Sequence, residues 1–323
     1  KGRIDADKGD FKLDFSSPNV VAYNNTFENI RVDVDNKNPL YNAYIELDSI
    51  KTKGYKISDF SLINVTMNDT LFVRSEFKGG PKNQDFFNLN LYHTINEKNQ
   101  SVVGFKKSEI NFRDYLWYLN ENNTKDNKVV FNKKLTDFSI EKIMMSHNDQ
   151  KVELEGVLKD STYKQLRLSF DDVDLGKVTP ALDNMSFGGK LNGEVNLEQN
   201  KSVYLPTAAL TVDSLVVNKV MMGDLNLEVT GEDSFRKFNV NSSIINDHVE
   251  NFFLNGNIEI INKESILALN AGFTRFNISP IGPLLGSIFS DMRGFASGRA
   301  SIAGSVRNPE VDGSIYLNEA GMK

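Results

Sequence analysis

The sequence predicts an all-β protein, an elongated curled β-sheet in the form of a groove or taco-like β-solenoid with one or two short helices. Three observations support this fold class. Apolar and polar residues alternate along most of the chain, turn-forming residues separate the alternating runs at short intervals, and only two short stretches follow another pattern. Alternation with period two is typical of strands with one apolar and one solvated face.

The alternating runs extend through the whole sequence and predict roughly 20–25 strands, a density typical of large all-β architectures. Clear examples, in chain order, are Phe11/Leu13/Phe15, Ala43/Ile45/Leu47, Phe87/Leu89/Leu91, Leu166/Leu168/Phe170, Leu225/Leu227/Val229, Phe252/Leu254/Gly256/Ile258/Ile260, Leu267/Leu269/Ala271/Phe273, Ile302/Gly304/Val306 and Val311/Gly313/Ile315/Leu317. Such runs suit antiparallel or solenoidal sheet, because strands of a parallel sheet covered on both faces are continuously apolar.

Turn signals lie between these runs. Asparagine is frequent in them because its side chain bonds to the local backbone and because it tolerates positive φ. The predicted turns include Asn24-Asn25, Asn36-Lys37-Asn38-Pro39, Lys53-Gly54, Gly79-Gly80-Pro81, Asn122-Asn123, Asn255-Gly256 and Asn308-Pro309.

Two stretches break the alternation. Residues 279–289 predict a short helix, with Ser279 as N-cap and Pro280 at the first helical position. Residues 179–185 have the same form and predict about one helical turn.

The two helical stretches belong to an internal repeat, whose copies span residues 170–197 and 273–302. Each copy predicts a strand, a short helix and a Gly-x-x-x-Gly segment that leads into another strand, with glycines at 189 and 193 in one copy and at 294 and 298 in the other. Chance similarity among glycine-rich turns is the alternative explanation. A long-period repeat in a chain of strands predicts an array, so we expect residues 1–323 to form one continuous, elongated β-groove section.

Composition excludes several classes of function. The chain has no cysteine, which removes disulfide scaffolds, thiol nucleophiles and cysteine-ligated metals. The three histidines, His93, His147 and His248, are scattered, so no metal site is predicted. With 37 Lys and Arg against 43 Asp and Glu the net charge is −6, which argues against a nucleic-acid partner. No apolar window is long enough to span a membrane as a helix.

No catalytic motif occurs, and we expect a protein that is not an enzyme and needs no cofactor. The densest acidic cluster, Asp171-Asp172-Val173-Asp174, lacks the glycine and terminal glutamate of a calcium loop and is interpreted as a solvated strand end. The carboxylate pairs Asp5/Asp7 and Asp33/Asp35 have the spacing of one strand face, which also favours a solvated surface over glycoside hydrolysis.

The apolar faces of the strands must be covered, and the sequence offers no long helices to cover them. A sandwich or a filled solenoid would bury these faces internally, whereas an open groove would bind the acyl chains of a lipid. The residues predicted to line such a groove are Leu166, Leu168, Phe170, Val195, Leu197, Leu225, Leu227, Val229, Phe252, Leu254, Ile258, Ile260, Leu267, Leu269, Ile302 and Ile315.

Several segments carry a resemblance to a known family. They are residues 108–119, residues 152–156, residues 166–175, residues 191–195, and the succession Gly294-x-x-x-Gly298, Ile302, Gly304, Val306 and Asn308-Pro309-Glu310-Val311-Asp312-Gly313. In these segments the chain resembles the TamB family, within the AsmA-like group of bacterial envelope proteins. The resemblance covers most of residues 100–323, and the richness in Asn and Lys is similar to the Bacteroidetes branch.

The resemblance implies a periplasmic section of a bridge-like lipid conduit, in which phospholipid acyl chains move along an apolar groove toward the outer membrane. It also implies an N-terminal inner-membrane anchor and a BamA-type outer-membrane barrel partner, both engaged through regions outside this sequence. Because the chain begins at Lys1 without a leader, we expect it to be an interior or C-terminal-side fragment of a longer protein.

Two other functions stay open from the sequence. A strand-rich scaffold could assist outer-membrane protein assembly by pairing its edge with nascent strands. A glycan-binding β-solenoid would need aromatic residues exposed on the solvated face, for which Tyr115, Trp117 and Tyr118 are the best candidates.

Overall fold

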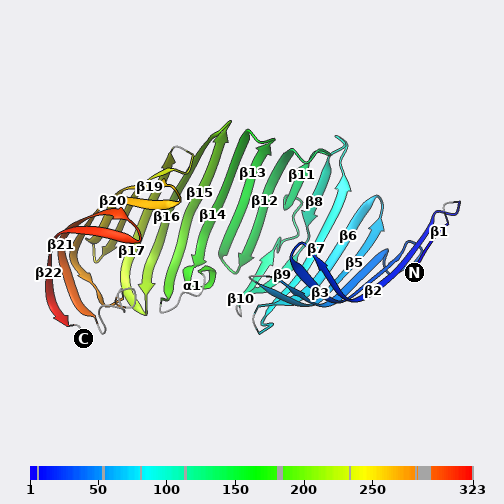
Figure 1. Ribbon diagram of the computed structural model, residues 1–323, viewed down its shortest axis with the longest axis horizontal. Helices are drawn as coiled ribbons and strands as arrows, with labels where there is room; N and C mark the ends of the chain where they lie inside the picture. The colour runs from blue at the N-terminus through cyan, green and yellow to red at the C-terminus, as the bar shows by residue number, and fades with distance from the viewer. Residues whose placement is uncertain are drawn as a thin grey trace. The chain divides into compact units, whose positions relative to one another are not determined.

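The computed structural model describes residues 1–5, 7–52, 55–80, 82–112, 115–179, 185–232, 234–280, 282 and 292–321. The described strands form one antiparallel β-sheet of 22 strands, and the only α-helix in these residues is α1 (Leu175–Val178) (Figure 1). The predicted all-β fold with very little helix is therefore confirmed. The chain divides into two compact units: unit 1 comprises Lys1–Asn148 and Leu154–Gly156, and unit 2 comprises Asp149–Glu153 and Val157–Lys323.

Unit 1 begins with antiparallel strands that pair in chain order. They are β1 (Gly2–Asp5), β2 (Asp10–Ala22), β3 (Asn25–Asp35), β4 (Ala43–Lys51), β5 (Lys56–Met67), β6 (Thr70–Gly79) and β7 (Asp85–Ile95). Asparagine supports the turns as predicted: Asn24 and Asn68, for example, have φ of 60° and 48°.

Unit 1 then departs from the simple meander, because short strands form two tiers between β7 and β12 (Asp137–His147). In the first tier β8 (Ser101–Phe105) pairs with β7 and with β11 (Lys128–Phe131), and β11 pairs with β12. In the second tier β9 (Ser108–Phe112) pairs with β7 and with β10 (Tyr115–Leu119), and β10 pairs with β12.

The aromatic run in β10 does not form the exposed cluster that a glycan-binding surface requires. Trp117 lies opposite Ile110 and is only 4% exposed, and its ring is 5.7 Å from that of Tyr115. Tyr118 alternates to the other face, where the Lys107 ammonium lies 4.5 Å from its ring centroid. Trp117, a candidate for the exposed aromatic surface that the glycan-binding alternative needs, is therefore buried instead.

A buried carboxylate stabilises the end of unit 1 that contains the β4–β5 and β6–β7 connections. Asp85 is almost completely buried, and the Tyr55 hydroxyl donates a 2.6 Å hydrogen bond to its Oδ2. Burial, followed by this hydrogen bond, raises the pKa of the Tyr55 phenol above its ordinary value. The phenol therefore stays protonated in the folded state at pH values where the unfolded chain has begun to ionise.

We expect alkaline pH to reveal this interaction. A raised folded-state pKa contributes stability below the ordinary pKa of tyrosine near 10, and that stability is lost as pH rises toward the folded-state value. Tyr55→Phe should lower the free energy of unfolding at pH 8 by about 1 kcal/mol. As the pH rises above 10, the free energy of unfolding of the variant should then decrease less steeply than that of the wild type. Urea titrations at both pH values measure this.

Tyr23→Phe, at an exposed site, is the matched control. Equal alkaline declines in wild type and Tyr55→Phe would contradict the assignment.

Unit 2 is a continuous antiparallel meander after β13 (Gln150–Lys159), which supplies residues to both units. Its strands are β14 (Tyr163–Asp174), β15 (Phe187–Asn200), β16 (Val203–Val217), β17 (Val220–Glu232), β18 (Lys237–Asn246), β19 (Val249–Ile261), β20 (Glu264–Asn277), β21 (Arg293–Ser305) and β22 (Asn308–Gly321).

The two copies of the sequence repeat occupy β14–β15 and β20–β21, and they share their irregularities. The register shifts between Phe170 and Val173 in one copy and between Phe273 and Phe276 in the other. Gly193 and Gly298 have φ of 113° and 143°, and a Cβ on either would lie 2.1 Å from a carbonyl oxygen of the next strand. Each copy therefore carries a bulge followed by a close approach of two strands.

The one α-helix among the described residues, α1, lies outside both stretches that the sequence predicts to be helical. The helix α1 lies before the predicted stretch 179–185 and begins after Asp174, whose side chain accepts a hydrogen bond from the Gly176 amide at 2.9 Å. It ends at Thr179, which is extended because the residue before a proline disfavours helical geometry. Residues 180–184 lie outside the described residues. So does most of the predicted helix 279–289, of which Ser279, Pro280 and Gly282 are described, in a 3₁₀ turn.

Candidate functional site

The strand register of unit 2 places all of the predicted groove residues on one face of its sheet. Directly opposed residues of antiparallel strands share a face, so each face can be followed from strand to strand. One transverse row, which we call the central row, is apolar from β14 to β22. It consists of Leu168, Val195, Ala208, Val229, Val240, Gly256, Leu269, Ile302 and Val311.

The rows on either side of the central row are also apolar, except for one polar residue on β18. Ser242 lies between Leu227 and Leu254 and is buried. The adjacent rows contain Phe170, Leu210, Leu227, Ser242, Leu254, Ala271 and Ala300 on one side, and Leu166, Leu197, Phe238, Ile258 and Leu267 on the other. We call this surface of β14–β22 the apolar face.

The opposite face of the same strands is polar. One of its rows runs through Glu228, Asn241, Asn255, Asn270, Ser301 and Asp312. On this face Asn196 and Arg167 donate hydrogen bonds to Glu194, and these interactions lower the pKa of the Glu194 carboxyl. The two faces differ as the period-two alternation predicts.

The apolar face is closed by its own side chains at one end of the strands. This closed end contains the β16–β17 turn, where Asn218 Nδ2 donates a 2.8 Å hydrogen bond to the carbonyl oxygen of Pro280. Neighbouring strands are about 4.8 Å apart, so a flat sheet would hold β17 and β20 about 14 Å apart. The hydrogen bond joins the β16–β17 turn to the segment after β20, in keeping with the curvature of the unit 2 ribbon (Figure 1). Buried residues at this end include Val173, Val212, Leu215, Met222, Phe276 and Ile278.

The other end of the strands, the open end, leaves apolar side chains accessible. Of the predicted groove residues, Ile260 at this end is exposed and Leu269 is buried. The others are half-buried, except Ile315, which is exposed on the last strand, β22, nearer the closed end. Val311, at the end of the central row on the last strand, β22, is also exposed. The apolar face therefore combines a packed core at the closed end with accessible apolar surface toward the open end.

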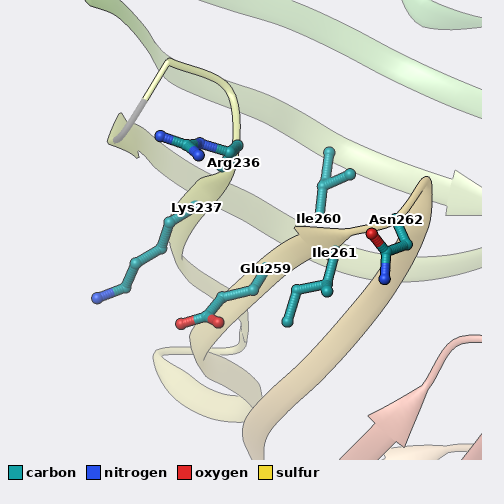
Figure 2. Close-up of a pocket in the computed structure, with 6 residues that line it drawn as sticks. All are labelled: Arg236, Lys237, Glu259, Ile260, Ile261 and Asn262. Atoms are coloured by element: carbon teal, nitrogen blue, oxygen red, sulfur yellow. The ribbon is translucent and has the colours of Figure 1, made fainter.

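A pocket of about 430 Å³ lies at the open end, where β18 meets β19 (Figure 2). Lys237 is directly opposite Glu259 across the strand pair, and its ammonium lies 3.7 Å from Glu232. Ile260 and Ile261 point away from each other in the close-up, as successive residues of a strand must. The pocket is lined by two cations and one carboxylate, and these residues include no nucleophile–base pair.

The acidic residues that the sequence singled out have structural partners. Lys151 is 3.2 Å from Asp171, Lys190 is 3.9 Å from Asp172, and Asp174 caps α1. Asp35 is 3.2 Å from Lys12. Among the described residues, no group of three or more Asp, Glu or His side chains could hold a metal ion.

Several residues of the apolar face were missed by the sequence analysis although they follow the same alternation. Ala208, Leu210 and Val212 of β16 are examples, and Val240 and Ile244 of β18 are others. Unit 1 has a comparable row, apolar except for Asn64, whose residues were not among the predicted groove residues. It runs through Leu13, Val34, Ala43, Asn64, Val73, Leu91 and Phe105.

In the part of the chain that the structure describes, no helix has the length and hydropathy needed to cross a membrane. Comparisons with protein-family models, with curated proteins and with solved structures find no match to this chain. The resemblance to the TamB family therefore stays a prediction that rests on the quoted residues.

Proposed function

We propose that the apolar face of unit 2 binds phospholipid acyl chains and serves as a periplasmic section of a lipid conduit toward the outer membrane. The observation that carries this proposal is the central row, which is apolar without interruption from β14 to β22. An inner-membrane anchor and a BamA-type barrel partner, acting through other regions of a longer protein, belong to the same proposal.

The chemistry of the apolar face suits a mobile hydrocarbon ligand. Burial of an acyl chain is favourable by about 0.8 kcal/mol per CH₂ group, and it needs no directional partner. A row of aliphatic side chains presents nearly the same surface at every strand, so a chain can move from one strand to the next without crossing a polar barrier. The half-buried residues toward the open end provide the accessible surface for this contact.

Leu227→Asp tests the proposal, because Leu227 lies beside the central row, between Leu210 and Ser242. The new carboxylate would face the apolar surface, and we expect phospholipid recovered with the purified protein to fall roughly tenfold or more. Mass spectrometry of the extracted lipid measures this. Asn226→Asp places the same carboxylate one residue away on the polar face and should retain the lipid.

Circular dichroism establishes whether each variant keeps its sheet, and Leu254→Asp repeats the test on β19. A folded Leu227→Asp protein with unchanged lipid content would contradict the proposal. Binding of amphipathic strand peptides without any bound lipid would favour the assembly scaffold instead.

A further inference from the structure

A second apolar surface lies on unit 1, on the face opposite its own apolar row. On this outer face Ile63 lies opposite Arg74, and Val65 lies opposite Phe72, which in turn lies opposite Tyr92. Ile63 and Val65 are 38% and 36% exposed, and Met67 at the tip of the β5–β6 hairpin is 58% exposed.

The apolar residues surround a shallow pocket of about 520 Å³ whose rim is basic. Lys106 and Lys107 line it together with Arg74. We call this surface the outer patch; it consists of Ile63, Val65, Phe72, Arg74, Lys106 and Lys107.

Each of the two lysines of the outer patch makes a cation–π contact with a tyrosine ring. The Lys106 ammonium is 5.5 Å from the Tyr92 centroid, and the Lys107 ammonium is 4.5 Å from the Tyr118 centroid. Neither forms an ion pair with a described residue, whereas Arg74 is paired with Glu76. The outer patch therefore has a local positive charge on a chain whose net charge is −6.

We propose that the outer patch docks unit 1 onto the surface of an anionic phospholipid bilayer. Exposed aliphatic and aromatic side chains favour the boundary between headgroups and acyl chains, and adjacent lysines attract anionic headgroups. The patch combines both features in one place. An acidic protein partner would match the charge but would leave the exposed apolar strand residues without a role. This interaction lies on another unit and another face than the proposed groove.

Vesicle co-sedimentation of the whole chain tests the docking surface. The wild type should bind vesicles of phosphatidylcholine mixed with phosphatidylglycerol and should bind pure phosphatidylcholine vesicles much more weakly. Because each basic residue near an anionic surface strengthens binding several-fold, Lys106→Glu with Lys107→Glu should weaken binding by about tenfold or more. High salt should reduce wild-type binding in the same direction.

The matched control is Lys133→Glu with Lys134→Glu, which makes the same charge change at exposed lysines in the β11–β12 turn of the same unit. Its binding should stay within about twofold of the wild type, since charges beyond a Debye length of ~8–10 Å are screened. Fluorescence of the single tryptophan, Trp117, reports folding of unit 1. If the glutamate pair does not fold, Lys106→Gln with Lys107→Gln replaces it.

Equal binding of neutral and anionic vesicles would overturn the proposal, as would equal losses in the Lys106/Lys107 and Lys133/Lys134 variants. Binding to soluble polyglutamate without binding to vesicles would also overturn it and would assign the patch to an acidic protein partner.

Discussion

Gly193→Ala is expected to destabilise unit 2 by about 3 kcal/mol, a large effect for the addition of one methyl group. Two independent causes act at this position. Its φ of 113° is strained for any residue with a side chain, and a Cβ would lie 2.1 Å from the carbonyl oxygen of Ala209 in the neighbouring strand. A backbone carbonyl cannot move aside without breaking the β15–β16 pairing, so the strands would have to separate.

Hydrogen exchange measured by mass spectrometry is the sharpest assay, because it reports each strand separately. Gly193→Ala should accelerate exchange in β15 and β16 while β2–β6 of unit 1 keep their wild-type protection. Gly188→Ala is the matched control in the same strand, since its Cβ would meet only Val216 Cβ at 3.5 Å, an ordinary contact. Equal protection in Gly193→Ala and Gly188→Ala would show that the close approach contributes nothing.

The internal repeat extends this expectation to β21. Gly298 has a φ of 143°, and its Cβ would lie 2.1 Å from the Ser314 carbonyl oxygen. The same substitution at Gly298 should therefore open β21 and β22 by the same mechanism. The sequence analysis paired these two glycines by their spacing, and the structure provides a common physical reason for both of them.

The face of the sheet on which a residue lies was easier to predict than whether that residue is buried. Period-two alternation determines which side of a sheet a residue occupies, and this is why the predicted groove residues share one face. Alternation does not determine whether a neighbouring strand covers that face, and β22 is the last strand of the sheet and is exposed along its length. Leu269 and Ile315 were therefore predicted alike, although one is buried and the other is 46% exposed.

Helix boundaries and the two-tier region were harder to predict, for local reasons. The sequence analysis did not predict α1, which ends at Val178 because Thr179, the residue before a proline, is extended. In the two-tier region the strands are only four or five residues long, and both faces of β8 are covered, so Val102 and Val103 follow no alternation. The run Tyr-Leu-Trp-Tyr-Leu shows no clear period, so the sequence did not determine which face Trp117 occupies.

Asn120→Leu is expected to destabilise unit 1 by about 3 kcal/mol or more. Asn120 is fully buried, and its Nδ2 donates to the carbonyl oxygens of Phe105 and Thr124 at 2.7 and 2.9 Å. Its Oδ1 accepts the Thr124 amide at 2.8 Å. A leucine would leave three backbone groups unpaired in a dry environment, each at a cost of about 1–3 kcal/mol. Its φ of 51° also disfavours leucine.

The control for Asn120→Leu is Asn122→Leu, two residues away at an exposed site of the same turn. The sequence analysis marked this turn by Asn122-Asn123, whereas the buried amide that joins the first tier to the turn is that of Asn120. Urea unfolding followed through Trp117 fluorescence measures both variants, since Trp117 lies in β10 immediately before Asn120. Asn122→Leu should stay within about 0.5 kcal/mol of the wild type. A similar small change in Asn120→Leu would mean that the two tiers hold together through strand pairing and apolar contact alone.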